Sequence, residues 1–171
     1  MIMPREMEPS DVLQVIERLR HAGVRVYVAG GWGVDALIGE QSRPHADLDL
    51  AFDAAEEDRV LSALRQAGYV MITDQRPARF VLQDRSGHTV DFHPVVFDAS
   101  GDGEQTGFGG IKYRYPSTEL GRGIIGGTEV DCLSAELLIQ FHLGYTPTEK
   151  DVQDMNLLRA RLGVHLPPPY S

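Results

Sequence analysis

Three aspartates interrupt apolar stretches of the sequence in which carboxylates are unexpected. Asp47 and Asp49 stand one residue apart in ADLDLAFD, and Asp91 lies in TVDFHPV. Because positions i and i+2 of a strand face the same side, Asp47 and Asp49 should project together, leaving Leu48 and Leu50 to the core. Neighbouring carboxylates repel, and one pKa should rise unless a cation lies between them. The pattern predicts a site for a hard divalent cation such as Mg²⁺, with the three aspartates as oxygen ligands.

Two glycines precede the aspartates at the end of the apolar run VYVAGG. Gly30 and Gly31 are expected to end a strand and open a helix, where backbone N–H groups and the helix dipole can hold a phosphate. Glycine leaves room for that close approach. The stretch has no lysine-bearing Walker sequence, so it does not predict a P-loop ATPase.

Each of these motifs by itself is more often a turn or a solvated strand edge. Their order along the chain favours a metal-dependent phosphate site. Three convergent carboxylates could hold two Mg²⁺ ions, which activate an attacking oxygen and neutralise a leaving phosphate in an in-line displacement.

The first half of the chain must supply the elements that position these residues. Apolar spacing predicts a helix after Ser10 as N-cap that stops at Gly23. Alternation and turn residues then predict the following order: a strand over 24–31, a helix over 32–39, a strand over 46–53, a helix over 54–68, a third strand near 69–74, and a hairpin over 79–97 that turns at 84–87.

The second half begins with the glycine-rich, polar stretch 98–110, which we interpret as a flexible loop. A small hairpin over 123–134 should turn at Gly126 and Gly127. Ser134 should cap a helix over 135–143, and Thr148 should cap a last helix that ends near Leu162 and carries Val152, Met155, Leu158 and Leu162 on one face. The order predicts an α+β domain with a small mixed sheet and a short helical C-terminal part.

Composition narrows the function classes. The 171 residues carry a formal net charge of -9, which argues against a nucleic-acid-coating protein. Cys132 is the single cysteine, so no internal disulfide can form. No apolar run has the length of a membrane span or the pattern of a signal peptide. We expect a cytoplasmic protein without nucleic-acid or membrane partners.

The stretches GGWGVDALIGEQSRPHADLDLAFD and VDFHPV resemble the small antibiotic nucleotidyltransferases of the polymerase-β superfamily. The likeness runs from about Val24 to Leu158. It is closer to the A-type lincosamide nucleotidyltransferases and more distant from the aminoglycoside 2''-nucleotidyltransferases. It implies a polymerase-β-like nucleotidyltransferase domain over 1–133 and a C-terminal helical part over 134–171.

The resemblance also implies a reaction: transfer of a nucleoside monophosphate, usually AMP from ATP, to an antibiotic hydroxyl, with release of pyrophosphate. By the family's motif, Gly30 and Gly31 would meet the triphosphate, and Asp47 and Asp49 would bind Mg²⁺. Asp91 would be the third carboxylate and a candidate acceptor for the proton of the attacking hydroxyl. The lincosamide enzymes also imply a homodimer.

Neighbouring polar residues have two interpretations each. Arg43 could neutralise the triphosphate and His45 could orient a phosphate or the acceptor, or both could lie in a solvated loop. His93 could line the acceptor pocket or hydrogen-bond at a strand end. Lys150 could reach the nucleotide phosphates or be a surface charge. Asp35 is expected on the helix surface or behind the site.

The acceptor is the least determined part of the prediction, because the stretch 98–122 matches the family poorly. A lincosamide-like antibiotic is our main hypothesis. The alternatives are an aminoglycoside with the same chemistry, a protein partner as acceptor, and a nucleotide-binding module without catalysis.

Overall fold

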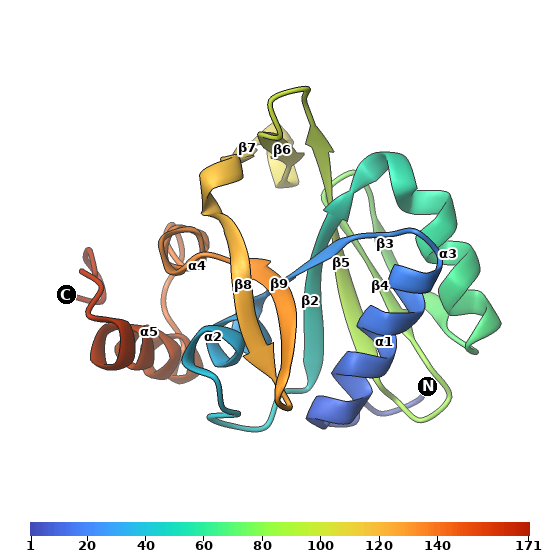
Figure 1. Cartoon of the computed structure of the whole chain (residues 1–171), viewed down its shortest axis with the longest axis horizontal. Helices are drawn as coiled ribbons and strands as arrows, with labels where there is room; N and C mark the ends of the chain where they lie inside the picture. The colour runs from blue at the N-terminus through green and yellow to red at the C-terminus, as the bar shows by residue number, and fades with distance from the viewer.

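The computed structural model describes residues 1–171 as a nine-stranded mixed sheet packed between α-helices (Figure 1). The strands are β1 (Val26–Ala29), β2 (Asp47–Asp53), β3 (Val70–Gln75), β4 (Arg79–Gln83), β5 (Thr89–Phe97), β6 (Gly103–Thr106), β7 (Lys112–Tyr115), β8 (Leu120–Ile125) and β9 (Thr128–Leu133). The α-helices are α1 (Pro9–His21), α2 (Gly30–Ile38), α3 (Glu57–Gln66), α4 (Ala135–Phe141) and α5 (Glu149–Leu162). None of them is long and apolar enough to cross a lipid bilayer.

Strand order places β2 at the centre of the sheet. The order is β3-β4-β5-β2-β1-β9-β8, and β6 and β7 extend from β5. β2 runs antiparallel to β1 and parallel to β5, which makes the sheet mixed, as expected. The chain must cross over between the parallel strands, and α3 with the β3–β4 hairpin forms that connection.

The two faces of the sheet bury different sets of apolar residues. Leu48, Leu50 and Phe52 of β2 are fully buried in the cluster that also contains the apolar sides of α1 and α3. The opposite face of the same strand, represented by Ala51, packs in the cluster formed with α4 and α5. Figure 1 shows α1 with α3, and α4 with α5, as two separate groups at opposite sides of the molecule. The alternation predicted for β2 is confirmed.

Most predicted elements are confirmed, including the caps of the C-terminal helices. Ser134 Oγ accepts the backbone N–H of Leu137 at 3.1 Å, and Thr148 Oγ1 accepts that of Asp151 at 3.2 Å. The β8–β9 hairpin turns at Gly126 and Gly127, both with positive φ.

The predicted start of the first helix was wrong by two residues. Glu8 is the N-cap, with Pro9 as the first helical residue and a capping box between Glu8 and Asp11. Proline suits that position because its missing N–H would be unpaired there in any case. The predicted helix over 54–68 divides into a 3-10 turn over Ala54–Glu56 and α3.

Residues 98–110 are not a flexible loop, as the sequence suggested. They contain β6, which pairs with the end of β5 and with β7. Gln105 of β6 is buried, and its side chain donates to the carbonyl of Ala78 at 2.8 Å and accepts from Tyr115 Oη at 2.5 Å. A short polar strand held by distant partners carries no apolar alternation, so the pattern could not reveal it.

The predicted apolar face of α5 is only half correct. Met155 and Leu158 are buried, but Val152 and Leu162 are 42% and 43% exposed. The buried side of the helix instead includes a carboxylate, Asp154, at 2% exposure. A buried charge of this kind requires a partner, and the guanidinium of Arg43 supplies it at 2.8 Å.

We predict that Gly123→Ala destabilises the fold, because a Cβ at this position of β8 would overlap the carbonyl of Ala36 at the end of α2. The cost should be about 1–3 kcal/mol in free energy of unfolding, measured by urea denaturation. Gly121→Ala on the same strand is the matched control, since a Cβ there meets nothing within 4 Å. Equal denaturation midpoints for the two variants would contradict the prediction.

Candidate active site

The site begins where β1 turns into α2. Gly30 is the first residue of α2 and has φ of +59°, a conformation that favours glycine. A Cβ at Gly30 would also overlap the carboxylate of Asp49, because Ala29 and Asp49 are partners in the β1–β2 ladder. The N–H groups at the start of this helix therefore lie directly beside a carboxylate.

Strand register brings the second carboxylate next to the first. Asp49 of β2 and Asp91 of β5 are direct partners in the parallel pair. His93 joins them, and one ligand atom from each of Asp49, Asp91 and His93 lies within 4.8 Å of the others. The ring atom Nε2 of His93 is 3.1 Å from Asp49 Oδ1 and 3.7 Å from Asp91 Oδ1. Burial works against the charged ring, but the hydrogen bond to Asp49 and the two carboxylates raise the pKa of His93.

Arg79 of β4 holds one oxygen of Asp91 and leaves the other free. Its Nη1 donates to Asp91 Oδ2 at 2.6 Å, whereas Asp91 Oδ1 is buried without a hydrogen-bond partner. Burial raises the pKa of Asp91, and the charge of Asp49 adds to this rise, whereas His93 and Arg79 oppose it. Sequence reasoning missed Arg79. The β4–β5 register, which pairs Val81 with Asp91, is what places Arg79 within reach.

Asp47 is the first residue of β2, and it is not among the three residues whose ligand atoms lie within 4.8 Å of one another. Asp47 is exposed, yet desolvation of its carboxylate by the surrounding protein, followed by the charges of Asp49 and Asp91, raises its pKa to about 6. Such a rise is what the sequence predicts for crowded carboxylates without a bound cation.

A cavity of about 250 Å³ opens beside Asp47 and Asp49. Its walls come from the start of α2, from the loop before β2 and from the region at the start of α5. The lining residues are Gly30, Gly31, Arg43, His45, Ala46, Asp47, Asp49, His142, Thr148, Lys150, Asp151 and Asp154. Lys150 is exposed and forms no ion pair. The structure therefore gathers Gly30, Gly31, Arg43 and Lys150 around one space, and their role in nucleotide binding stays a prediction.

His45 lies in the wall behind the glycines. It is 2% exposed, and its Nε2 is 2.5 Å from Asp35 Oδ2. Asp35 is equally buried and also accepts Ser42 Oγ at 2.6 Å, so it lies behind the site and not on the helix surface. The ring of His45 packs against Trp32, with centroids 4.8 Å apart.

The side chains of His45 and Arg43 leave no room for any residue larger than glycine at position 31. A Cβ there would be 2.5 Å from His45 Nδ1 and 2.8 Å from Arg43 Nη2.

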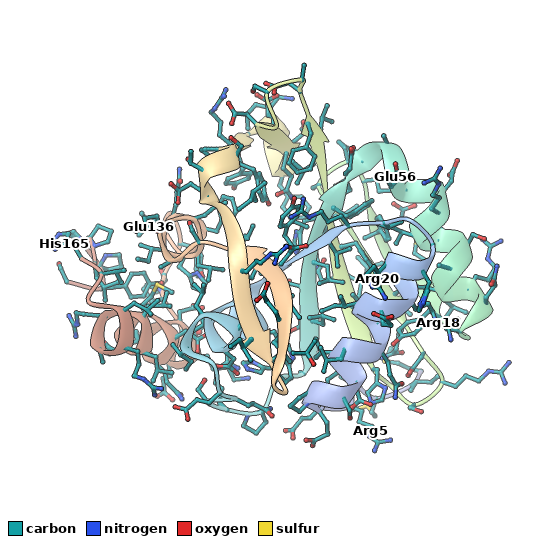
Figure 2. The ribbon with its side chains drawn as sticks, in the orientation of Figure 1. Arg5, Arg18, Arg20, Glu56, Glu136 and His165 are labelled. Carbon is teal, nitrogen blue, oxygen red and sulfur yellow. The ribbon has the colours of Figure 1, made fainter.

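Charged residues elsewhere, such as Arg5, Arg18 and His165, lie on the periphery of the molecule (Figure 2). The site thus offers anion-binding groups (the helix start and two cations) next to cation-binding ones (three carboxylates). This is the chemistry that a phosphate ester with a metal ion requires.

Comparison with known proteins agrees with this geometry. Residues 11–158 match the family model of aminoglycoside-2''-adenylyltransferase. A lincosamide resistance protein of Staphylococcus haemolyticus is 29% identical over 151 residues, which cover 88% of this chain and 94% of that protein. The resemblance inferred from the glycine and aspartate motifs is confirmed.

Solved structures extend the likeness to the fold. The lincomycin-bound crystal structure of the lincosamide antibiotic adenylyltransferase LnuA superimposes with a TM-score of 0.83 at 28% identity, covering 91% of this chain and 99% of that one. ANT(2'')-Ia in complex with adenylyl-2''-tobramycin shares the fold, with a TM-score of 0.73 at 18% identity, covering 91% of this chain and 89% of that one. The chain belongs to the aminoglycoside-2''-adenylyltransferase family.

Proposed function

We propose that the protein is a Mg²⁺-dependent adenylyltransferase that transfers AMP from ATP to a hydroxyl of a lincosamide-like antibiotic and releases pyrophosphate. The observation that carries the proposal is the juxtaposition of the Gly30–Gly31 helix start with Asp49 and Asp91, which the strand register aligns. The acceptor class is supported by the similarity to a lincosamide resistance protein and to the lincomycin-bound enzyme.

The anion-binding side of the cavity is assigned to the triphosphate. Gly30 and Gly31 are the first two residues of a nine-residue helix, and the start of a helix stabilises a negative group. Lys150 adds an unpaired positive charge from α5, and Arg43 adds guanidinium donors from the loop before β2. Together these groups would bind and orient the phosphates of ATP.

The acids fit a divalent cation. Asp47, Asp49 and Asp91 offer the carboxylate oxygens that Mg²⁺ prefers, and Asp91 Oδ1 is buried without a partner, which a cation would satisfy. We expect the three carboxylates to hold two ions. Bound Mg²⁺ would supply neutralisation of phosphate charge. His93, a nitrogen donor, suits the role of orienting Asp49 by its hydrogen bond.

In the reaction, the acceptor oxygen forms a bond to the α-phosphorus of ATP while the bond from that phosphorus to the bridging oxygen of pyrophosphate breaks. The hydroxyl proton must leave at the same time. We assign Asp91 as the acceptor of that proton, because burial raises its pKa and Arg79 holds its carboxylate in place. His45 lines the cavity, but it is 2% exposed and lies 2.5 Å from Asp35, so we assign it to support of Gly31.

An aminoglycoside is the second candidate acceptor. Two observations favour it: the family model that matches, and the shared fold of the enzyme bound to adenylyl-2''-tobramycin. The net charge of -9 suits a polycationic substrate, although a lincosamide also carries an amine. The chemistry assigned to the aspartates is the same in either case.

We further propose that the working unit is a cytoplasmic homodimer. The tip of the β6–β7 hairpin presents Phe108 and Ile111, which are 60% and 58% exposed, and Val96 on β5 is 67% exposed. Apolar side chains gathered on a surface often mark an interface. Light scattering at micromolar concentration should give a mass twice that of the chain, and a monomer would contradict the dimer.

The function is tested by mass spectrometry of lincomycin, clindamycin and kanamycin after incubation with the protein, ATP and Mg²⁺. We expect a gain of one AMP on the lincosamides. A gain on kanamycin alone would move the acceptor to the aminoglycosides and leave the reaction unchanged. No gain on any drug would contradict the proposed acceptors.

Asp49→Asn in the same assay tests whether the described site performs the reaction. The variant should lose several kcal/mol of transition-state stabilisation, roughly a hundredfold or more in rate, because it removes a charge from the proposed cation site. Because the substitution also weakens the hydrogen bond from His93 Nε2 to Asp49, the variant is melted beside wild type, and the two rates are compared at a temperature where both are folded. Asp58→Asn, which removes an exposed carboxylate from α3, is the control and should be fully active.

The pKa of Asp47 is raised to about 6 from an ordinary value of 3.8, so we expect the free energy of unfolding to depend on pH. Between these values the folded protein binds more protons than the unfolded chain, so stability falls as pH rises and Asp47 ionises. Without divalent ions, Asp47→Asn should therefore gain stability relative to wild type as the pH rises from about 5 to about 7. Mg²⁺ should stabilise wild type more at the higher pH, because it binds the ionised carboxylate. Thermal melts with and without Mg²⁺ measure both effects, and a stability difference independent of pH would contradict them.

A further inference from the structure

One ion pair connects the loop before β2 with the C-terminal helix. Arg43 Nε donates to Asp154 Oδ1 at 3.0 Å, and Arg43 Nη2 donates to Asp154 Oδ2 at 2.8 Å. The side chain of Asp154 is 2% exposed and that of Arg43 is 16% exposed. A two-pronged pair of this kind fixes the plane of the guanidinium as well as its position.

The pair leaves part of the guanidinium free. An arginine side chain has five N–H donors, and Asp154 takes two of them. A third, on Nη1, reaches the carbonyl of Pro44 at 3.2 Å. The remaining donors on Nη1 and Nη2 have no partner in the protein. Nη2 lies against Gly31, at the edge of the cavity that we assign to the phosphates.

The two cations that line the cavity, Arg43 and Lys150, differ because only Arg43 has a carboxylate partner. Asp154 balances the positive charge of Arg43, and it also raises the pKa of Arg43 through their hydrogen bond. Arg43 therefore contributes fixed donors more than net charge. Lys150, one helical turn before Asp154 on α5, has no carboxylate partner and contributes the net charge.

We propose that Asp154 is a positioning residue for the nucleotide: it holds Arg43 against Gly31 so that the free guanidinium donors face the phosphates. This inference rests on the proposed function. It makes α5 part of the phosphate site in two ways, through a direct contact from Lys150 and through Arg43 by means of Asp154. The competing explanation is structural, namely that the pair only attaches α5 to the loop.

The two explanations differ in what Asp154→Asn changes. Loss of a purely structural pair lowers the melting temperature and leaves nucleotide affinity unchanged. Loss of a positioning pair weakens nucleotide binding by about tenfold or more, because a charge-assisted hydrogen bond to phosphate loses its alignment. Where Asp154 acts through Arg43, its substitution has no further effect once Arg43 is replaced.

The experiment is calorimetric titration of the full chain with a non-hydrolysable ATP analogue and Mg²⁺. The proteins are wild type, Asp154→Asn, Arg43→Gln, the double variant, and Glu149→Gln. The last removes an exposed carboxylate from the same helix and serves as the control. We expect weaker binding for both single variants, no additional loss in the double variant, and wild-type affinity for the control. The KM for the acceptor should not change.

Removing one partner of a buried pair leaves the other charge unpaired and lowers stability, so Asp154→Asn is melted alongside the titration. If that variant does not fold, Asp154→Glu replaces it, because it keeps the charge and displaces the guanidinium by one methylene. Wild-type affinity in a folded Asp154 variant, or further loss in the double variant, would overturn the inference. Absence of binding by wild type would overturn the proposed function as well, which separates the two failures.

Discussion

The close approach of Gly30 to the carboxylate of Asp49 is the constraint on which the site depends. β1 and β2 are antiparallel neighbours, and Ala29 faces Asp49 in their ladder. The chain must therefore turn into α2 directly beside that carboxylate. Only a residue without Cβ and with a positive φ fits there. The same contact that limits the sequence places the start of a helix directly next to a carboxylate.

The carboxylates of the site are therefore crowded, and neighbouring side chains offset part of the repulsion between them. His93 donates to Asp49, and Arg79 holds one oxygen of Asp91. Asp47 has no such partner, and its pKa rises to about 6. The remaining repulsion between the carboxylates lowers the stability of the protein alone and would favour binding of a cation. Strain of this kind is expected at functional sites, where local stability is exchanged for affinity.

The C-terminal helices extend the site beyond the sheet. α5 packs against α2 through Met155 and Leu158, and it brings Lys150, Asp151 and Asp154 to the cavity. The proposed roles of Lys150 and Arg43 both depend on this packing. The cavity is thus lined by residues from α2, from the loop before β2 and from α5, which are far apart in the sequence.

The sequence by itself determined the local parts of this protein. Alternation identified β2, capping residues identified α4 and α5, and the Gly-Gly and Asp-x-Asp motifs identified the centre of the site and its family. These features depend on residues that lie close together in the chain, so local helix and strand periodicity is enough to predict them.

Tertiary structure decided which distant side chains meet. It aligned Asp49 with Asp91, brought Arg79 to Asp91, and buried His45 against Asp35 beneath Gly31. It also turned part of the predicted loop into β6, and joined Arg43 to Asp154 across 111 residues of sequence. Strand register and helix packing arise from burial of the whole core. For that reason, a pattern read along one segment cannot predict which pairs they create.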